Sequence, residues 1–194
     1  MNAGGKVILV VGPSSAGKST LARAIQAAAP EPYLVLSLDG LFASVDERWG
    51  SGGAFREAGF AYADQADGSV RVVYGEIGRR MLAGMRRAAA AHARAGVNVV
   101  FDDMLLEESA AADWAEALAS VDALLVRLTA PLNLLREREA ARPHPRKRGL
   151  AAGHTALHDA IAADIVIDTS AITPAAAATM VLEAQSAPVR VLAR

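Results

Sequence analysis

Cysteine is absent from all 194 positions of the sequence. Disulfide bonds, catalysis by a thiolate and zinc sites with cysteine ligands are therefore excluded. An extracellular scaffold held by disulfides is excluded as well, so we expect a cytoplasmic protein. Long apolar runs are also missing, because none reaches the ~18 residues of a membrane span and the N-terminal segment lacks the apolar core of a signal peptide. We therefore expect no association with a membrane.

An excess of positive charge is lacking too. Lysine and arginine number 20 against 21 for aspartate and glutamate, which gives a net charge of -1. A protein that holds nucleic acid mainly by its phosphates is usually more basic, so we expect no nucleic-acid partner. Hydrophobic residues make up 53% of the chain and charged residues 21%, a balance that excludes a disordered protein. The length predicts a single domain over residues 1–194, and the sequence leaves a homo-oligomer open.

Short apolar runs alternate with helical segments along the chain. The runs predict buried strands at residues 7–11, 33–38, 97–101, 122–128 and 165–167. Apolar residues at spacings of three and four predict a long amphipathic helix over residues 70–95. Shorter helices are expected at residues 20–29, 41–45, 107–119, 131–141, 151–163 and 174–186. This alternation predicts an α/β fold with three layers, α/β/α, around a five-stranded parallel sheet.

The first expected strand runs directly into a glycine-rich loop. Residues 12–19 read GPSSAGKS and fit the phosphate-binding pattern G-x-x-x-x-G-K-[ST] in full, with a strand before and a helix after. The glycines let the backbone wrap around phosphate oxygens, while successive N–H groups and the helix N-terminus face the anion. In such loops the lysine, here Lys18, reaches the β- and γ-phosphates and the hydroxyl of Ser19 ligates Mg²⁺.

This motif predicts a P-loop NTPase fold of the nucleotide-kinase type, with ATP and Mg²⁺ as cofactors. The residues expected to bind the nucleotide are Gly12, Pro13, Ser14, Ser15, Ala16, Gly17, Lys18, Ser19 and Thr20. Ligands of open parallel sheets bind at the carboxyl ends of the strands, so the polar residues that follow the strands should converge on one cleft.

Asp39 closes the second expected strand. A carboxylate at this place can accept the proton of a hydroxyl group while its oxygen attacks the γ-phosphate. The alternative is that Asp39 caps the helix that begins near Gly40, a role that aspartate fills well. Spacing supports both interpretations, and the apolar neighbours in LSLDGL, residues 36–41, favour the general base.

Two further acids, Asp102 and Asp103, close the third expected strand. A carboxylate there suits the holding of Mg²⁺, so Ser19 and Asp102 are the expected metal residues. Asp103 could contact the acceptor. The alternative is a solvated pair of acids in which one caps the next helix.

A basic, proline-broken stretch holds Arg142, Arg146, Lys147 and Arg148. Small-molecule kinases need a mobile cationic segment that closes over the phosphates, which predicts a lid over about residues 142–149. Arg142 and Arg146 are its expected catalytic residues, and a solvated surface is the alternative. An acceptor-pocket segment is expected over about residues 45–70, where Trp49, Phe55, Phe60 and Tyr62 would line the pocket or pin a long loop to the body.

The remaining polar groups give weaker signals. None of the four histidines has a carboxylate at metal-site spacing; His92 is expected on a helix surface and His158 packed inside. The triplet from Asp168 to Ser170 could border the adenine pocket or form a turn.

The chain resembles the chloramphenicol 3-O-phosphotransferases and their relatives. The matching stretches are VILVVGPSSAGKST (7–20), PEPYLVLSLDGL (30–41), VNVVFDDML (97–105) and HDAIAADIVIDTS (158–170). The resemblance implies an ATP-dependent kinase that phosphorylates a hydroxyl group of a small aromatic antibiotic such as chloramphenicol. It also implies Asp39 as the general base and Lys18 with the Arg142 region as stabilisers of the transition state.

Other functions fit the same motifs. The nearest alternatives apply this chemistry to a nucleoside, a sugar acid, adenylyl sulfate or a cell-wall sugar, the last as a toxin-like kinase. A regulatory module that binds a nucleotide without catalysis belongs to a different class, and the isolated acid at Asp39 argues against it.

Overall fold

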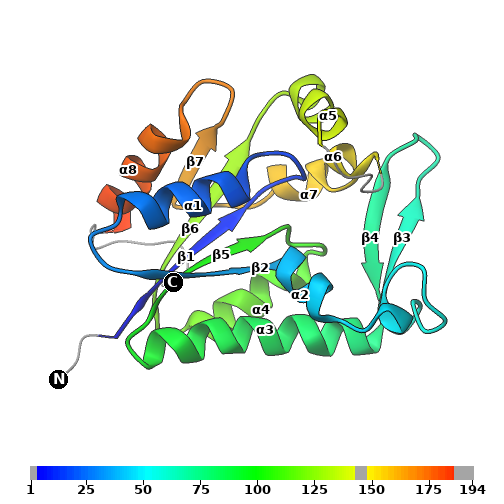
Figure 1. Cartoon of the computed structure of the whole chain (residues 1–194), viewed down its shortest axis with the longest axis horizontal. Helices are drawn as coiled ribbons and strands as arrows, with labels where there is room; N and C mark the ends of the chain where they lie inside the picture. Colours follow the sequence, from blue (N-terminus) through cyan, green and yellow to red (C-terminus); the bar gives the residue numbers. More distant parts are fainter. Residues whose placement is uncertain (1–3, 143–147, 186–194) are drawn as a thin grey trace.

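A computed structural model describes residues 4–142 and 148–185 (Figure 1). Its strands are β1 (Lys6–Val11), β2 (Tyr33–Ser37), β3 (Phe60–Asp64), β4 (Val70–Tyr74), β5 (Asn98–Asp103), β6 (Asp122–Thr129) and β7 (Ile165–Asp168). Its longer helices are α1 (Lys18–Ala28), α3 (Glu76–Arg94), α4 (Ser109–Leu118), α5 (Leu132–Ala140) and α8 (Pro174–Gln185). Shorter helical segments are α2 (Leu38–Ser44), η1 (Glu47–Trp49), α6 (Leu150–Gly153) and α7 (Thr155–Asp159).

The central sheet has five parallel strands in the order β2-β5-β1-β6-β7. Figure 1 shows α1 and α8 on one face and α3 and α4 on the other. The alternation of side chains along β1 explains the two cores, because Ile8 and Val10 pack toward α1 and α8 while Val7, Leu9 and Val11 pack toward α3 and α4. The predicted α/β/α fold with a five-stranded parallel sheet is confirmed.

The start of the helix expected over residues 70–95 differs from its prediction. Residues Val70–Tyr74 form strand β4, not the start of a helix, and pair with β3 as an antiparallel hairpin. Val70 and Val72 are buried while Arg71 and Val73 are exposed, so the period of this run is two residues. The helix expected over residues 70–95 therefore begins only at Glu76, after Gly75.

Two smaller boundaries also shift. The second strand ends at Ser37 and α2 begins at Leu38, so Asp39 lies in the first turn of a helix. The helix expected over residues 151–163 is two short helices, α6 and α7, that meet at His154. Within the two described ranges, no helix combines the length and apolarity that would let it cross a membrane.

Candidate active site

The loop between β1 and α1 has the backbone shape of an anion cradle. Gly12, Ser15 and Gly17 all have positive φ, at 149°, 67° and 96°. A side chain at Gly12 would place its Cβ 2.6 Å from the carbonyl oxygen of Leu128, so only glycine fits there. No side chain caps the N-terminus of α1, which leaves the first N–H groups of this helix facing the loop. The sequence-predicted phosphate-binding residues are thus brought together by one contiguous segment.

Lys18, Ser19 and Asp102 form a buried polar group beneath this loop. The Lys18 ammonium donates to the carbonyl oxygens of Gly12 at 2.9 Å and Pro13 at 3.0 Å, and its Nζ lies 3.9 Å from Oδ1 of Asp102. The Ser19 hydroxyl donates to Oδ2 of Asp102 at 2.5 Å. Burial lowers the pKa of Lys18, although the nearby carboxylates oppose this shift. Burial likewise raises the pKa of Asp102 against the effect of Lys18.

This group fits a divalent cation in its chemistry. A hydroxyl and a carboxylate are the oxygen donors that Mg²⁺ prefers, and Mg²⁺ completes its shell with phosphates and water. A cation near Asp102 would also offset the cost of burying that carboxylate. The described residues hold no cluster of three or more histidine, aspartate or glutamate side chains that could bind a metal alone. A metal at Ser19 and Asp102 would therefore depend on the phosphates of a bound nucleotide.

Asp103 turns away from the site. It is 2% exposed, and its carboxylate accepts hydrogen bonds from the Leu105 backbone at 3.1 Å and the Trp114 indole at 2.7 Å. Nε of Arg86 lies 4.0 Å from the same carboxylate. Adjacent residues of a strand point to opposite faces, so Asp102 faces α1 while Asp103 faces α3 and α4. The expectation that Asp103 contacts the acceptor, and the alternative of a solvated pair, are both wrong.

Asp39 is placed in the site by helix α2. The cap of this helix is Ser37, whose hydroxyl accepts a hydrogen bond from the Gly40 backbone at 3.0 Å. The interpretation of Asp39 as the N-cap is therefore wrong. The Asp39 carboxylate is close enough to act on Lys18 and Asp102, because its negative charge opposes the fall in the pKa of Lys18 and adds to the rise in the pKa of Asp102, shifts that burial dominates in both residues.

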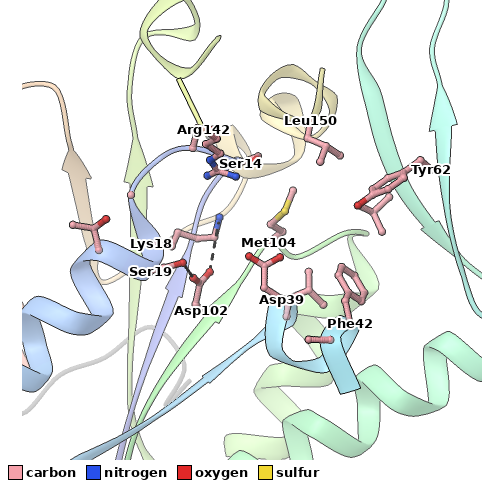
Figure 2. A pocket seen from close by; sticks show the side chains of 16 residues that line it. Ser14, Lys18, Ser19, Asp39, Phe42, Tyr62, Asp102, Met104, Arg142 and Leu150 are labelled. Carbon is pink, nitrogen blue, oxygen red and sulfur yellow. Dashed lines mark hydrogen bonds and ion pairs between the residues drawn. The ribbon is translucent and has the colours of Figure 1, made fainter. Parts of the chain in front are cut away.

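One cavity of about 390 Å³ is lined by Lys18, Ser19, Asp102 and Asp39 together (Figure 2). Its phosphate side holds Lys18, Ser19 and Asp102, and Arg142 lies above them beside Ser14. Its other side is apolar and is lined by Leu38, Phe42, Ala43, Tyr62, Val72, Met104 and Leu150. Figure 2 shows Asp39 pointing into the cavity from α2, between these two sides. Arg146 lies outside the described residues, as do most of the expected lid residues.

A second cavity of about 570 Å³ lies on the other side of the loop. Thr169 lines it and binds Arg138, which donates to the Thr169 hydroxyl and backbone carbonyl, both at 2.9 Å. Arg142 lines both cavities. Asp168 instead closes a turn, because its carboxylate accepts from the backbone and the hydroxyl of Ser170. The triplet at the end of β7 thus closes a turn through Asp168 and lines a cavity through Thr169, and the assignment of that cavity to adenine stays a prediction.

The four aromatic residues of the segment at 45–70 divide into two groups. Tyr62 lines the main cavity, and Phe60 packs edge-on against Phe42 with ring centroids 4.7 Å apart. Trp49 and Phe55 contact each other, at 4.9 Å, and line none of the cavities described here. A smaller cavity of about 200 Å³ continues behind Phe42 and Tyr62 toward Val45 and Gly50.

Several lining residues were not found from the sequence. Phe42, Val72, Met104 and Leu150 carry no chemical signature, and they converge only because α2, β4, the end of β5 and α6 meet in space. A single signal was available for Val72, because the alternation in VRVVY indicates a strand with one buried face. His92 is exposed on α3 and His158 is buried, both as expected, and His154, for which no expectation was stated, is also buried.

Comparisons with known proteins agree with this geometry. The model of one protein family, described as chloramphenicol phosphotransferase-like protein, matches residues 5–186. Among solved structures, the Mycobacterium tuberculosis APS kinase in complex with AMPPNP and APS is similar with a TM-score of 0.67 at 16% identity, over 95% of this chain and 99% of that one. A gluconokinase from Sinorhizobium meliloti 1021 gives a TM-score of 0.61 at 19% identity, over 96% and 94%.

A third similar structure is the tunicamycin resistance protein of Deinococcus radiodurans, with a TM-score of 0.63 at 14% identity over 95% of this chain and 97% of that one. A search of curated protein sequences finds no match. At these identities the solved structures establish the P-loop kinase fold. With a family match over nearly its whole length, the chain belongs to the chloramphenicol phosphotransferase-like family.

Proposed function

We propose that the protein transfers the γ-phosphoryl group of ATP to a hydroxyl group of a neutral, largely apolar small molecule. The observation that carries this proposal is the position of Asp39 in the main cavity (Figure 2). It stands between the cationic, phosphate-binding side at Lys18 and an apolar side that could hold an acceptor. A carboxylate there is placed to orient a hydroxyl group and to accept its proton. A regulatory module that only binds nucleotide has no need of such an acid.

In the proposed reaction the phosphates are held by backbone N–H groups of the loop from Gly12 to Thr20 and by the ammonium group of Lys18. Asp39 takes the proton of the acceptor hydroxyl, whose oxygen forms a bond to the γ-phosphorus while the bond to the β–γ bridging oxygen breaks and ADP leaves. Mg²⁺ held by Ser19 and Asp102 would supply neutralising charge at the β- and γ-phosphates. Arg142, at the rim of both cavities, is positioned to stabilise the charge that develops on the transferring group.

The second cavity supplies space for the base of the nucleotide. It begins at Ser15 and Gly17 of the loop and extends to Thr169 and Pro174. The Arg138 guanidinium is fixed at its wall by two hydrogen bonds to Thr169. A planar, pre-organised guanidinium of this kind can stack on an aromatic base.

The charge of the acceptor side favours one class of substrate. Among the described residues that line the main cavity, the cations are Lys18 and Arg142, and both lie on the phosphate side. Gluconate and shikimate carry a carboxylate and APS carries a sulfate and a phosphate, groups that proteins usually bind with arginine or lysine. The aromatic rings of Phe42 and Tyr62 instead suit an apolar or aromatic group. A neutral aromatic antibiotic such as chloramphenicol therefore fits better than a sugar acid or adenylyl sulfate.

The proposal is tested by presenting the purified protein with Mg·ATP and a panel of acceptors. The panel contains chloramphenicol, tunicamycin, a nucleoside, gluconate, shikimate and APS, and the readouts are ADP release and the mass of the phosphorylated product. We expect a product with a gain of one phosphoryl group from a neutral acceptor and none from the anionic acceptors. Preferred phosphorylation of gluconate, shikimate or APS would overturn the assignment of substrate class.

A further inference from the structure

The segment from Gly149 to His158 braces the wall of the acceptor cavity. Figure 1 shows α6 between α5 and β4. Three successive residues of β4 bind this segment. The Val70 N–H donates to the Gly149 carbonyl at 3.0 Å, the Arg71 side chain donates to the Gly153 carbonyl at 2.8 Å, and the Val72 N–H donates to Nε2 of His154 at 3.1 Å.

The brace lies very close to the strand. A Cβ atom at Gly153 would stand 1.8 Å from the Val70 carbonyl oxygen, so any side chain there would push α6 away from β4. The opposite end of the segment is anchored to α5, because the Glu139 carboxylate accepts from the backbone N–H groups of Gly149 and Ala151, both at 2.9 Å. The hairpin is therefore held against a segment that is itself fixed to the body.

A second histidine of the brace holds a different part of the same cavity. Nε2 of His158 is hydrogen-bonded to the backbone carbonyl of Met104, which follows β5. Met104 and Val72 both line the main cavity, although they are far apart in the sequence. His154 and His158 lie one helical turn apart, since the His158 N–H donates to the His154 carbonyl. Two neighbouring imidazoles thus hold two separate pieces of one wall.

The hydrogen bonds show which ring nitrogen carries the proton in each of the two histidines. Nε2 of His154 accepts from an N–H group, so its proton must lie on Nδ1. Nε2 of His158 faces a carbonyl, which can only accept, so its proton must lie on Nε2. The two rings are 2% and 1% exposed, and burial lowers the pKa of each to about 4, with the positive charge of Lys18 acting in the same direction. Both rings are therefore neutral at physiological pH.

We propose that His154 and His158 are positioning residues for the acceptor: as neutral imidazoles protonated on opposite nitrogens, they hold Val72 and Met104 where the acceptor packs. This inference rests on the proposed kinase function. It assigns no contact with the nucleotide to either ring, because the bonds that they make run to β4 and to the end of β5. If a histidine served only to fill the core, its replacement would not change the KM for the acceptor more than the KM for ATP.

The first test separates the hydrogen bond from the volume of the ring. His154→Gln can keep an acceptor near the place of Nε2, whereas His154→Leu fills similar space and leaves the Val72 N–H unpaired. With the acceptor from the panel that the wild type phosphorylates best, we expect His154→Leu to raise the acceptor KM about 10-fold, because β4 loses its bond to the brace and Val72 is no longer held where the acceptor packs. The KM for ATP should stay within about twofold of wild type, and His154→Gln should recover most of the loss. Equal rises in both KM values, or no difference between Leu and Gln, would overturn the proposal.

The second test needs no acceptor and stands even if the substrate assignment fails. Nitrogen-15 NMR of the histidine side chains should show His154 protonated at Nδ1 and His158 at Nε2 at pH 7. Amide exchange at Val72 should be faster in His154→Leu than in wild type and nearly normal in His154→Gln. The same tautomer in both rings, or unchanged exchange at Val72 in the leucine variant, would refute the brace. Absence of phosphorylation of every panel compound by the wild type would instead refute the proposed function alone.

Discussion

The two sides of the main cavity are built in different ways. The phosphate side comes mostly from the contiguous residues 12–20, whose backbone is fixed by two glycines and by the start of α1, and distant segments add Asp102 and Arg142. The acceptor side is assembled from α2, β3, β4, the residue after β5 and the start of α6, and its members are apolar. The backbone of one side is thus determined locally and that side carries the cations, while the other side depends on packing between distant segments. Substitutions on the acceptor side can change the substrate without altering the chemistry of transfer.

The largest effect is expected on the phosphate side. Lys18→Ala removes the only described ammonium beneath the loop, whose positive charge can balance the γ-phosphate in the transition state. We expect turnover to fall on the order of 10³-fold or more. The circular dichroism spectrum should stay that of the wild type, because the strand and helix around the loop are untouched. Normal turnover by a folded variant would contradict the assignment of the loop.

Asp39 joins the two sides, and its replacement tests the proposed base. Asp39→Asn keeps the shape of the side chain and loses the ability to take a proton at neutral pH. We expect ATP binding, measured by calorimetry, to stay near normal because the loop is unchanged. Acceptor phosphorylation should fall by roughly 10²- to 10⁴-fold, the usual contribution of general-base catalysis. A rate near that of the wild type would remove Asp39 from the mechanism.

The same contrast explains what could be predicted from the sequence. The P-loop is a local motif in which residue type and spacing determine the backbone, so residues 12–20 were recognisable directly. The buried parallel strands were equally clear, because apolar, β-branched runs such as residues 7–11 need no knowledge of their neighbours. The order of the strands and their register depend on long-range pairing and came only from the structure.

The acceptor side was hidden for physical reasons. The residues VRVVY fit the helical spacing that continues to Ile77, and they also fit an alternation with a period of two residues. The sequence does not distinguish these patterns, and the segment is a strand because it pairs with β3. The sequence does not distinguish Asp102 from Asp103, because adjacent acids look alike, while the pleat of β5 sends them to opposite faces. His154 gave no signal at all, since its role depends on a contact with Val72 across 82 positions of the chain.

The adjacent acids of β5 allow a matched comparison of site and core. Asp103→Asn weakens the hydrogen bonds from the Leu105 backbone and the Trp114 indole, while Arg86 keeps its ion pair with Asp113 at 2.7 Å. We therefore expect a loss of about 2 kcal/mol in the free energy of unfolding. Asp102→Asn keeps an oxygen for the Ser19 hydroxyl, and Lys18 keeps its bonds to the Gly12 and Pro13 carbonyls when the carboxylate 3.9 Å away is lost. We therefore expect a smaller loss of this free energy, about 1 kcal/mol. The Mg²⁺ concentration for half-maximal activity should rise roughly 10-fold or more in Asp102→Asn, by analogy with other losses near metal sites. Urea unfolding and Mg²⁺ titration of both variants would expose the reverse pattern if these roles were exchanged.

The buried histidines predict how stability depends on pH. Their pKa falls from 6.5 to about 4 on folding, so between these values the unfolded chain binds protons that the folded chain does not. Stability is therefore complete above pH 6.5 and decreases as pH falls toward 4, with each histidine contributing up to about 1.4 kcal/mol per pH unit. The charged groups that face the two rings are Lys18, Arg71 and Arg127.

The measurement compares urea unfolding at pH 7, 6 and 5 for the wild type and for His154→Gln. The contributions of other titrating groups to the pH dependence of stability cancel in the difference between the two proteins. We expect the stability of the variant to decrease less steeply with falling pH, because glutamine does not bind a proton. Parallel curves for the two proteins would show that His154 is not buried as a neutral ring.

The smallest effect is expected at helix α2, where the stabilising role of the cap residue Ser37 can be tested separately from the role of Asp39 in turnover. Ser37→Ala removes the hydroxyl that accepts from the Gly40 N–H and should cost about 1 kcal/mol of stability, the usual worth of such a cap. The side chain of Asp39 remains in place, so turnover should stay within a few-fold of wild type. Asp39→Ala should do the opposite, because it leaves the cap intact and removes the carboxylate from the cavity. We expect Ser37→Ala to lower the melting temperature with little change in turnover, and Asp39→Ala to lower turnover with little change in melting temperature. A larger loss of stability in Asp39→Ala than in Ser37→Ala would return Asp39 to a structural role and leave the acceptor side without a base.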